Sequence, residues 1–228
     1  MTPRPLLRRV AYLRRNRCGV LLVALCVFIL AYPVISHSRL GTTALNVGLV
    51  VIMMLGVWAL RVRRFVLIGV GTLCLLTLLA LVTARLGGEV RWLRPVTLGA
   101  TAIFIGAVTI ALLRYVLDYH IITTDKVFGA VAAYVLIALT FAVLFGLLEL
   151  VQPDAFRVAE SHATGGQLGW VGMMYFSFTV LTSTGFGEIT PYTDMARSLI
   201  VIEQVLGVMY VAFLIARLAN LYGRGRAG

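Results

Sequence analysis

The chain has 228 residues, of which 61% are hydrophobic and only 13% are charged. A soluble domain is nearer half apolar and a quarter charged, so this composition indicates an integral membrane protein. The net charge of +11 does not indicate a nucleic-acid partner, because the arginines form short clusters between apolar runs and no basic patch carries interleaved aromatic residues.

The apolar runs predict six spanning helices, since about 20 apolar residues are needed to cross a hydrocarbon core of about 30 Å. These runs cover 18–36, 44–60, 65–84, 95–113, 126–151 and 195–220. Segment 1–17 is basic, and the apolar run after it is too long for a signal peptide. We therefore expect a retained first helix behind a cytoplasmic N-terminal segment.

Basic residues orient these helices, because cytoplasmic loops carry an excess of lysine and arginine. With the N-terminus inside, most of the 20 basic residues fall on the inner side: Arg4, Arg8, Arg9, Arg14, Arg15, Arg17, Arg61, Arg63, Arg64, Arg114, Lys126, Arg217, Arg224 and Arg226. Arg85, Arg91 and Arg94 are exceptions in one outer loop. We expect both termini in the cytoplasm. Lys126 is the single lysine, which suggests a GC-rich genome and a bacterial inner membrane.

The segment between the last two spans differs in character from the rest. Residues 152–167 are polar and turn-rich, which predicts an extracellular turret. Residues 168–181 are apolar but too short to span, so they predict a re-entrant helix. Irregular backbone at membrane depth must be buried in protein or line a water-filled cavity. The following stretch, TSTGFGEITP (182–191), is therefore expected to line a pore.

The chemistry of this stretch suits a cation. Rings of backbone carbonyls can replace the hydration shell of an ion. Pointing successive carbonyls at one axis requires unusual backbone angles, which accounts for Gly185 and Gly187. Hydroxyls of Thr182 or Ser183 would add a further ring of oxygen ligands, and the negative end of the re-entrant helix would face the cation.

The run YFSFTVLTSTGFGEITP resembles the pore helix and selectivity filter of the potassium channel family, usually written T-x-G-Y/F-G-D/E. The resemblance implies a homotetramer with a pore unit at 115–222, in which residues 182–188 form the filter. It implies bound K⁺ at Ser183, Thr184, Gly185 and Phe186, with Thr182 and Gly187 completing the ion path. Phe176, Thr179 and Glu188 would support the filter.

This sequence departs from the family pattern at several of these positions. Phe186 replaces the commoner tyrosine, Glu188 the commoner aspartate, and Phe176 a hydrogen-bonding tryptophan. Thr184 stands where valine or isoleucine is usual. These changes put the strictness of selection for K⁺ over Na⁺ in question, so a weakly selective cation channel is an alternative.

Three residues in the flanking spans have candidate roles. Gly207 lies about where the family's inner helix carries a hinge glycine, although it could equally permit close helix packing. Acids within a membrane are functional candidates, so we single out Glu149 and Glu203. For Glu149 we expect a tie between the fifth span and the pore region. For Glu203 we favour structural hydrogen bonding over ion binding.

The first four spans, 18–114, form a sensor-like unit that lacks gating charges. A voltage sensor needs several arginines along one helix, and the fourth span carries only Arg114 at its inner end. We therefore expect a passive channel without steep voltage dependence. The basic N-terminal segment could contact anionic lipids or simply set the topology.

Other classes of function find less support. No nucleophile–base pair or metal cluster suggests an enzyme, and Cys18, Cys26 and Cys74 read as small buried hydrophobes. A transporter or a non-conducting structural subunit is the alternative from another class, but no inverted repeat is visible. We expect no cofactor beyond permeant K⁺ and no nucleic-acid partner.

Overall fold

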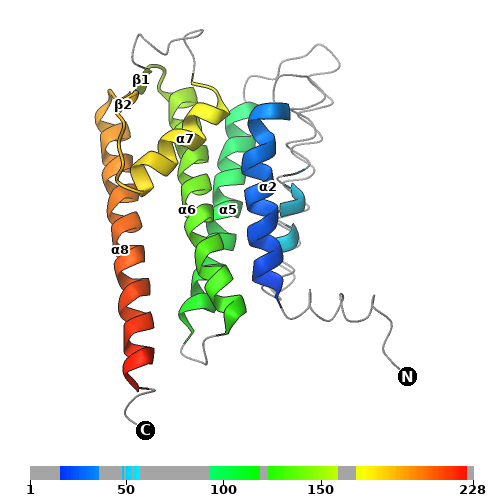
Figure 1. Cartoon of the computed structure of the whole chain (residues 1–228). Helices are drawn as coiled ribbons and strands as arrows, with labels where there is room; N and C mark the ends of the chain where they lie inside the picture. Colours follow the sequence, from blue (N-terminus) through cyan, green and yellow to red (C-terminus); the bar gives the residue numbers. More distant parts are fainter. Residues whose placement is uncertain are drawn as a thin grey trace. The chain divides into compact units, whose positions relative to one another are not determined.

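The computed structural model describes residues 16–35, 48, 50–52, 54–56, 93–118, 123–158 and 168–224. Helices dominate this part of the chain, as the composition predicts (Figure 1). In chain order the elements are α2 (Arg17–Ile35), α5 (Leu93–Leu117), α6 (Thr124–Val151), β1 (Phe156–Val158), α7 (Trp170–Leu181), β2 (Ile189–Pro191) and α8 (Asp194–Arg224).

Three of the described helices are long and apolar enough to cross a membrane: Pro95–Leu117, Thr124–Val151 and Asp194–Arg217. They match the predicted spans 95–113, 126–151 and 195–220. The predicted span 18–36 falls on α2, which is helical. The predicted span 65–84 and most of 44–60 lie outside the described residues.

The chain divides into two compact units, Met1–Thr140 and Phe141–Gly228. Within the described part of the first unit, the largest fully buried side chains are apolar: Leu21, Leu25, Ile105, Leu112 and Leu139. This division does not test the predicted domain limits at 18–114 and 115–222, which stay predictions.

Asp125 is the polar centre of the first unit. One carboxylate oxygen accepts the backbone N–H of Cys18 at 2.8 Å, and the other accepts the Tyr115 hydroxyl at 3.1 Å. The first N–H groups of a helix have no partner within the helix, so this contact satisfies one of them in α2. Lys126 donates to the Asp118 carbonyl at 3.2 Å and lies 5.8 Å from the Tyr115 ring centre.

In the second unit, a pair of short strands joins the two ends of the segment between α6 and α8. Strands β1 and β2 are antiparallel, with Phe156 opposite Pro191 and Val158 opposite Ile189. The sequence does not predict strands here, because three residues are too few to show an alternating pattern. The pairing brings the chain just after the filter back beside the end of α6.

An aromatic cluster lies where β1 meets α6 and α7. Phe145 is fully buried, and its ring centre lies 5.2 Å from that of Phe156 and 5.4 Å from that of Phe176. Phe156 and Phe176 are 5.5 Å apart in an edge-to-face arrangement. Such geometry stabilises aromatic pairs beyond the burial of their area. The cluster therefore connects α6, β1 and α7.

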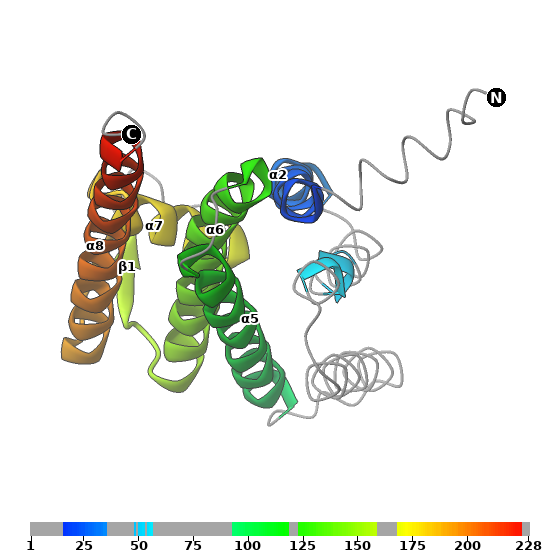
Figure 2. The ribbon, with the colours of Figure 1, turned by 90° about the horizontal axis from the view of Figure 1, so that it is seen from below.

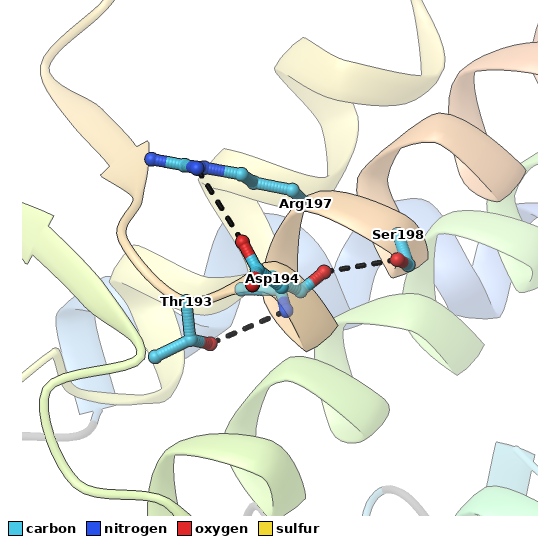
Figure 3. A network of polar contacts seen from close by, with 5 residues as sticks. Thr193, Asp194, Arg197 and Ser198 are labelled. Carbon is cyan, nitrogen blue, oxygen red and sulfur yellow. Dashed lines mark hydrogen bonds and ion pairs between the residues drawn. The ribbon is translucent and has the colours of Figure 1, made fainter.

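The start of α8 is capped by side chains (Figure 3). The Thr193 hydroxyl accepts the backbone N–H of Ala196 at 3.4 Å, and the Ser198 hydroxyl donates to the Asp194 carbonyl at 2.9 Å. Arg197 pairs with Asp194 at 3.5 Å, but both side chains are exposed, so this ion pair stabilises little. Threonine before the helix and aspartate in its first turn are the residues that favour a helix start.

Candidate functional site

The predicted re-entrant helix is α7, which lies beside α8 in both ribbon views (Figures 1 and 2). It begins at Trp170 after Gly169, whose extended backbone carries no side-chain cap. Its last turn is closed by Thr182, whose backbone N–H and hydroxyl both bond to the Phe178 carbonyl, at 3.1 and 2.7 Å. The helix ends there because the next residue, Ser183, has a left-handed φ of 56°.

The backbone of the predicted filter alternates in hand. Ser183, Gly185 and Gly187 have φ values of 56°, 55° and 83°, whereas the residues between them do not have positive φ. Alternation of this kind lets successive carbonyl groups face the same side of the chain. The angles agree with the requirement for glycine at 185 and 187. The left-handed conformation of Ser183 was not predicted, because serine rarely adopts it.

The amide groups of the filter are held by the end of α7. Thr184 and Gly185 both donate their backbone N–H to the Thr179 carbonyl, at 2.9 and 3.2 Å, and Ser183 donates to the Val180 carbonyl at 2.9 Å. Within the described part of the chain, the carbonyls of residues 183–187 accept no hydrogen bond. The N–H groups of Ser183, Thr184 and Gly185 therefore bond to α7, whereas the carbonyls of this segment have no partner among the described residues.

The side chains of the filter lie at the surface of the single chain. Residues 182–187 are all exposed, and the hydroxyls of Thr182 and Thr184 are 2.8 Å apart. Among the described residues, no group of three histidine, cysteine, aspartate or glutamate side chains could hold a metal ion. Backbone and hydroxyl oxygens are thus the ligands that this segment offers to a cation.

Tyr175 was not predicted as a site residue, but it contacts the predicted filter. Its ring stacks on that of Phe186, with centres 6.2 Å apart and planes at 8°. Desolvation, a hydrogen bond to Glu188 and the charge of that carboxylate raise the pKa of the Tyr175 phenol. The phenolic hydroxyl of Tyr175, on a helix that is mostly apolar, was the sequence feature that could have indicated this contact. Tyr175 thus contacts two residues of the predicted site.

The predicted support residues on α7 are buried. The Thr179 hydroxyl donates to the Phe176 carbonyl at 2.7 Å, while its own carbonyl holds the two filter amides described above. Phe176 has no polar tip and contributes through the aromatic cluster instead. Both residues therefore make buried contacts on the helix that precedes the predicted filter.

Glu149 connects the C-terminal end of α6 to the segment that follows it. Its two carboxylate oxygens accept the backbone N–H groups of Asp154 and Phe156, each at 3.2 Å. Asp154 has a φ of 64°, a conformation that aspartate tolerates, and this turns the chain back toward β1. The carboxylate thus fixes the entry to the strand pair.

Glu203 and Gly207 face α7 from α8. The Ser177 hydroxyl donates to Glu203 Oε1 at 2.5 Å, and both side chains are fully buried. A Cβ atom at Gly207 would lie 2.2 Å from the Leu181 carbonyl oxygen. The structure thus shows close packing at Gly207, while its role as a hinge stays a prediction. Ser177 was not predicted, although a serine in an apolar helix was a signal.

Comparison with known proteins places this geometry in context. Residues 133–224 match the family model described as ion channel, which includes α7, the filter and α8. The match supports an ion-channel pore domain. The chain is also 27% identical over 118 residues to Protein LctB from Geobacillus stearothermophilus, covering 51% of this chain and 87% of that protein. No solved structure matches the chain.

Proposed function

We propose that four copies of this chain form a passive, potassium-selective channel in a membrane, with six spans in each copy. The observation that carries the proposal is the backbone of residues 183–187. This backbone alternates in hand, and the N–H groups of Ser183, Thr184 and Gly185 bond to the end of α7. Its carbonyls accept no hydrogen bond from the described residues. Free carbonyls on one side of a fixed backbone are what a dehydrated cation requires.

Four-fold assembly follows from the need for a closed ring of ligands. One chain supplies one filter segment, and that segment is exposed along residues 182–187. The outer surface of α8 is also apolar and exposed, at Val201, Val205, Val208, Met209 and Ile215. Neighbouring copies and lipid would cover these surfaces. We place the channel in a bacterial inner membrane, with both termini on the cytoplasmic side.

Within such a ring, Ser183, Thr184, Gly185 and Phe186 would supply the K⁺-binding carbonyls, and the Ser183 hydroxyl the innermost ligand. No other cofactor is proposed. The described part of the predicted fourth span carries Arg114 at its inner end, and we therefore propose weak dependence on voltage.

Ion flux into proteoliposomes tests the proposal, with K⁺ and Na⁺ gradients compared side by side. The test variant is Gly185→Ala, because alanine is strained at a φ of 55° although space is open around it. The matched control is Gly146→Ala in α6, where the added Cβ also meets no atom within 4 Å and the helix suits alanine.

We expect strong K⁺ flux from the wild type and from Gly146→Ala, and at least a tenfold loss, in order of magnitude, from Gly185→Ala. Equal flux from Gly185→Ala and the wild type would contradict a filter role and favour a transporter or a structural subunit. Chemical crosslinking of the purified protein would count the copies, and a dimer would contradict the proposed ring.

A weakly selective K⁺/Na⁺ channel is the second candidate, and one observation favours it. Phe186 has no hydroxyl, so its ring is held by stacking on Tyr175 at 6.2 Å rather than by a hydrogen bond. Stacking restrains a ring less directionally than a hydrogen bond does. Comparable Na⁺ and K⁺ fluxes from the wild type would establish this candidate.

A further inference from the structure

The interface between α7 and α8 contains a fully buried carboxyl group. Glu203 and Ser177 both have no exposed surface, and the serine hydroxyl donates to Oε1. The second oxygen, Oε2, is buried and has no hydrogen-bond partner among the described residues. A polar atom buried in this way is costly, so the carboxyl group contributes poorly to stability.

A second contact lies one turn further along both helices. Leu181 follows Ser177 by four positions, and Gly207 follows Glu203 by four, so each pair shares a helix face. The absence of a side chain at Gly207 lets α8 approach the Leu181 carbonyl. We call these four residues the α7–α8 clasp. It combines one polar contact with one backbone contact.

Stability alone does not account for the polar half of the clasp. A leucine at position 203 would fill a similar volume without an orphaned oxygen, and replacing a buried polar pair by apolar residues is often neutral or stabilising. What a single directed hydrogen bond adds is a fixed register between two helices. A purely apolar contact would allow α7 to slide along α8.

The register matters because the predicted filter is hydrogen-bonded to the same turn of α7. Thr179 lies between the two contact residues of this helix, and its carbonyl accepts the amides of Thr184 and Gly185. Leu181 is the last residue of α7, directly before Thr182. A shift of α7 against α8 would therefore move the acceptor that sets the inner half of the filter.

We propose that the α7–α8 clasp sets the position of the filter relative to the inner helix, and that Glu203 is a positioning residue for ion selectivity. The proposal rests on the proposed channel function. It assigns Glu203 no contact with the ion. It also gives Ser177 a specific role, as the hydrogen-bond donor that fixes the register of α7 against α8.

The test uses the full chain and four variants. Glu203→Leu removes the acceptor, Glu203→Gln keeps an acceptor of the same shape, Ser177→Ala removes the donor, and the double variant Ser177→Ala/Glu203→Leu removes both. Ser198→Ala is the matched control, because it deletes a hydroxyl that bonds only within the first turn of α8. Three quantities are measured: the midpoint of thermal unfolding in detergent, hydrogen exchange of the filter amides, and the ratio of K⁺ to Na⁺ flux.

We expect the variants to rank differently in thermal stability than in filter exchange and flux ratio. Ser177→Ala should have the lowest midpoint of thermal unfolding, since it leaves the buried carboxyl group without its donor. The midpoint of the double variant should return toward that of the wild type, because the carboxyl group is gone as well. The Thr184 and Gly185 amides should nevertheless exchange about fivefold faster in the double variant, as for the loss of one hydrogen bond. The flux ratio should fall by about the same factor, while Glu203→Gln and Ser198→Ala behave as the wild type.

Three results would overturn the positioning role. Exchange and selectivity that recover together with stability in the double variant would make the pair purely structural. Glu203→Gln behaving as Glu203→Leu would show that the acceptor is not what matters. Filter exchange equal in the wild type and the double variant would also remove the role, and this can be measured without transport. A wild type that conducts no ion removes the channel function instead.

Discussion

Two glutamates of the second unit sit in opposite surroundings. Glu149, at the outer end of α6, uses both carboxylate oxygens to accept backbone N–H groups. Glu203, in the N-terminal half of α8, has one hydroxyl donor and one oxygen without a partner among the described residues. The turn after α6 is thus held by two backbone hydrogen bonds to one carboxylate, whereas the polar contact of α7 with α8 at Glu203 is a single hydroxyl bond. An acid that satisfies the backbone stabilises a fold, and one that is left incomplete is better explained by what it positions.

Among the substitutions that test this comparison, we expect the largest loss of stability at Gly207. In Gly207→Ala the added Cβ would lie 2.2 Å from the Leu181 carbonyl oxygen, so backbone has to move. Overpacking of this kind costs about 1–3 kcal/mol, and we expect a lower midpoint of thermal unfolding than for Gly146→Ala. A variant with wild-type stability but altered opening would instead establish the predicted hinge.

A smaller effect is expected from Glu149→Leu, which leaves the N–H groups of Asp154 and Phe156 without their acceptor. The loss should resemble that of a capping side chain, about 1–2 kcal/mol. Hydrogen exchange across 154–158 should rise while exchange of the filter amides stays unchanged. Faster exchange of the filter would contradict the separation of the two regions.

The smallest effect is expected at the surface of the strand pair. The Arg157 guanidinium lies 3.4 Å from the Tyr192 ring centre, and an exposed contact of this type stabilises by about 0.5–1 kcal/mol. Arg157→Ala should lower the unfolding midpoint slightly. Arg197→Ala, which removes only an exposed ion pair, is the matched control and should leave the midpoint nearly unchanged. A larger loss at Arg197 than at Arg157 would reverse our ranking of these contacts.

Local features of the site were predictable from the sequence, and long-range pairings were not. Gly185 and Gly187 predict unusual backbone angles, because glycine alone adopts such angles freely. Glu149 was expected to tie the end of its helix to the pore region, and the N–H groups that it accepts belong to the turn after that helix. The partner of Glu203 could not be named, because Ser177 is 26 positions away and helix packing sets their register. The three-residue strands and the left-handed Ser183 likewise depend on tertiary contacts.

The contact between Asp125 and Cys18 has a consequence for biosynthesis. The two residues are 107 positions apart, and α2 leaves the ribosome long before its acceptor exists. At about 5–20 residues per second, the first turn of α2 waits about 5–20 s for that carboxylate. During this interval the Asp125 carboxylate is absent, so the Cys18 N–H group needs another acceptor, such as water. Asp125 is the second residue of α6, so the acceptor is synthesised as α6 begins, and the bond then joins an early helix to a later one.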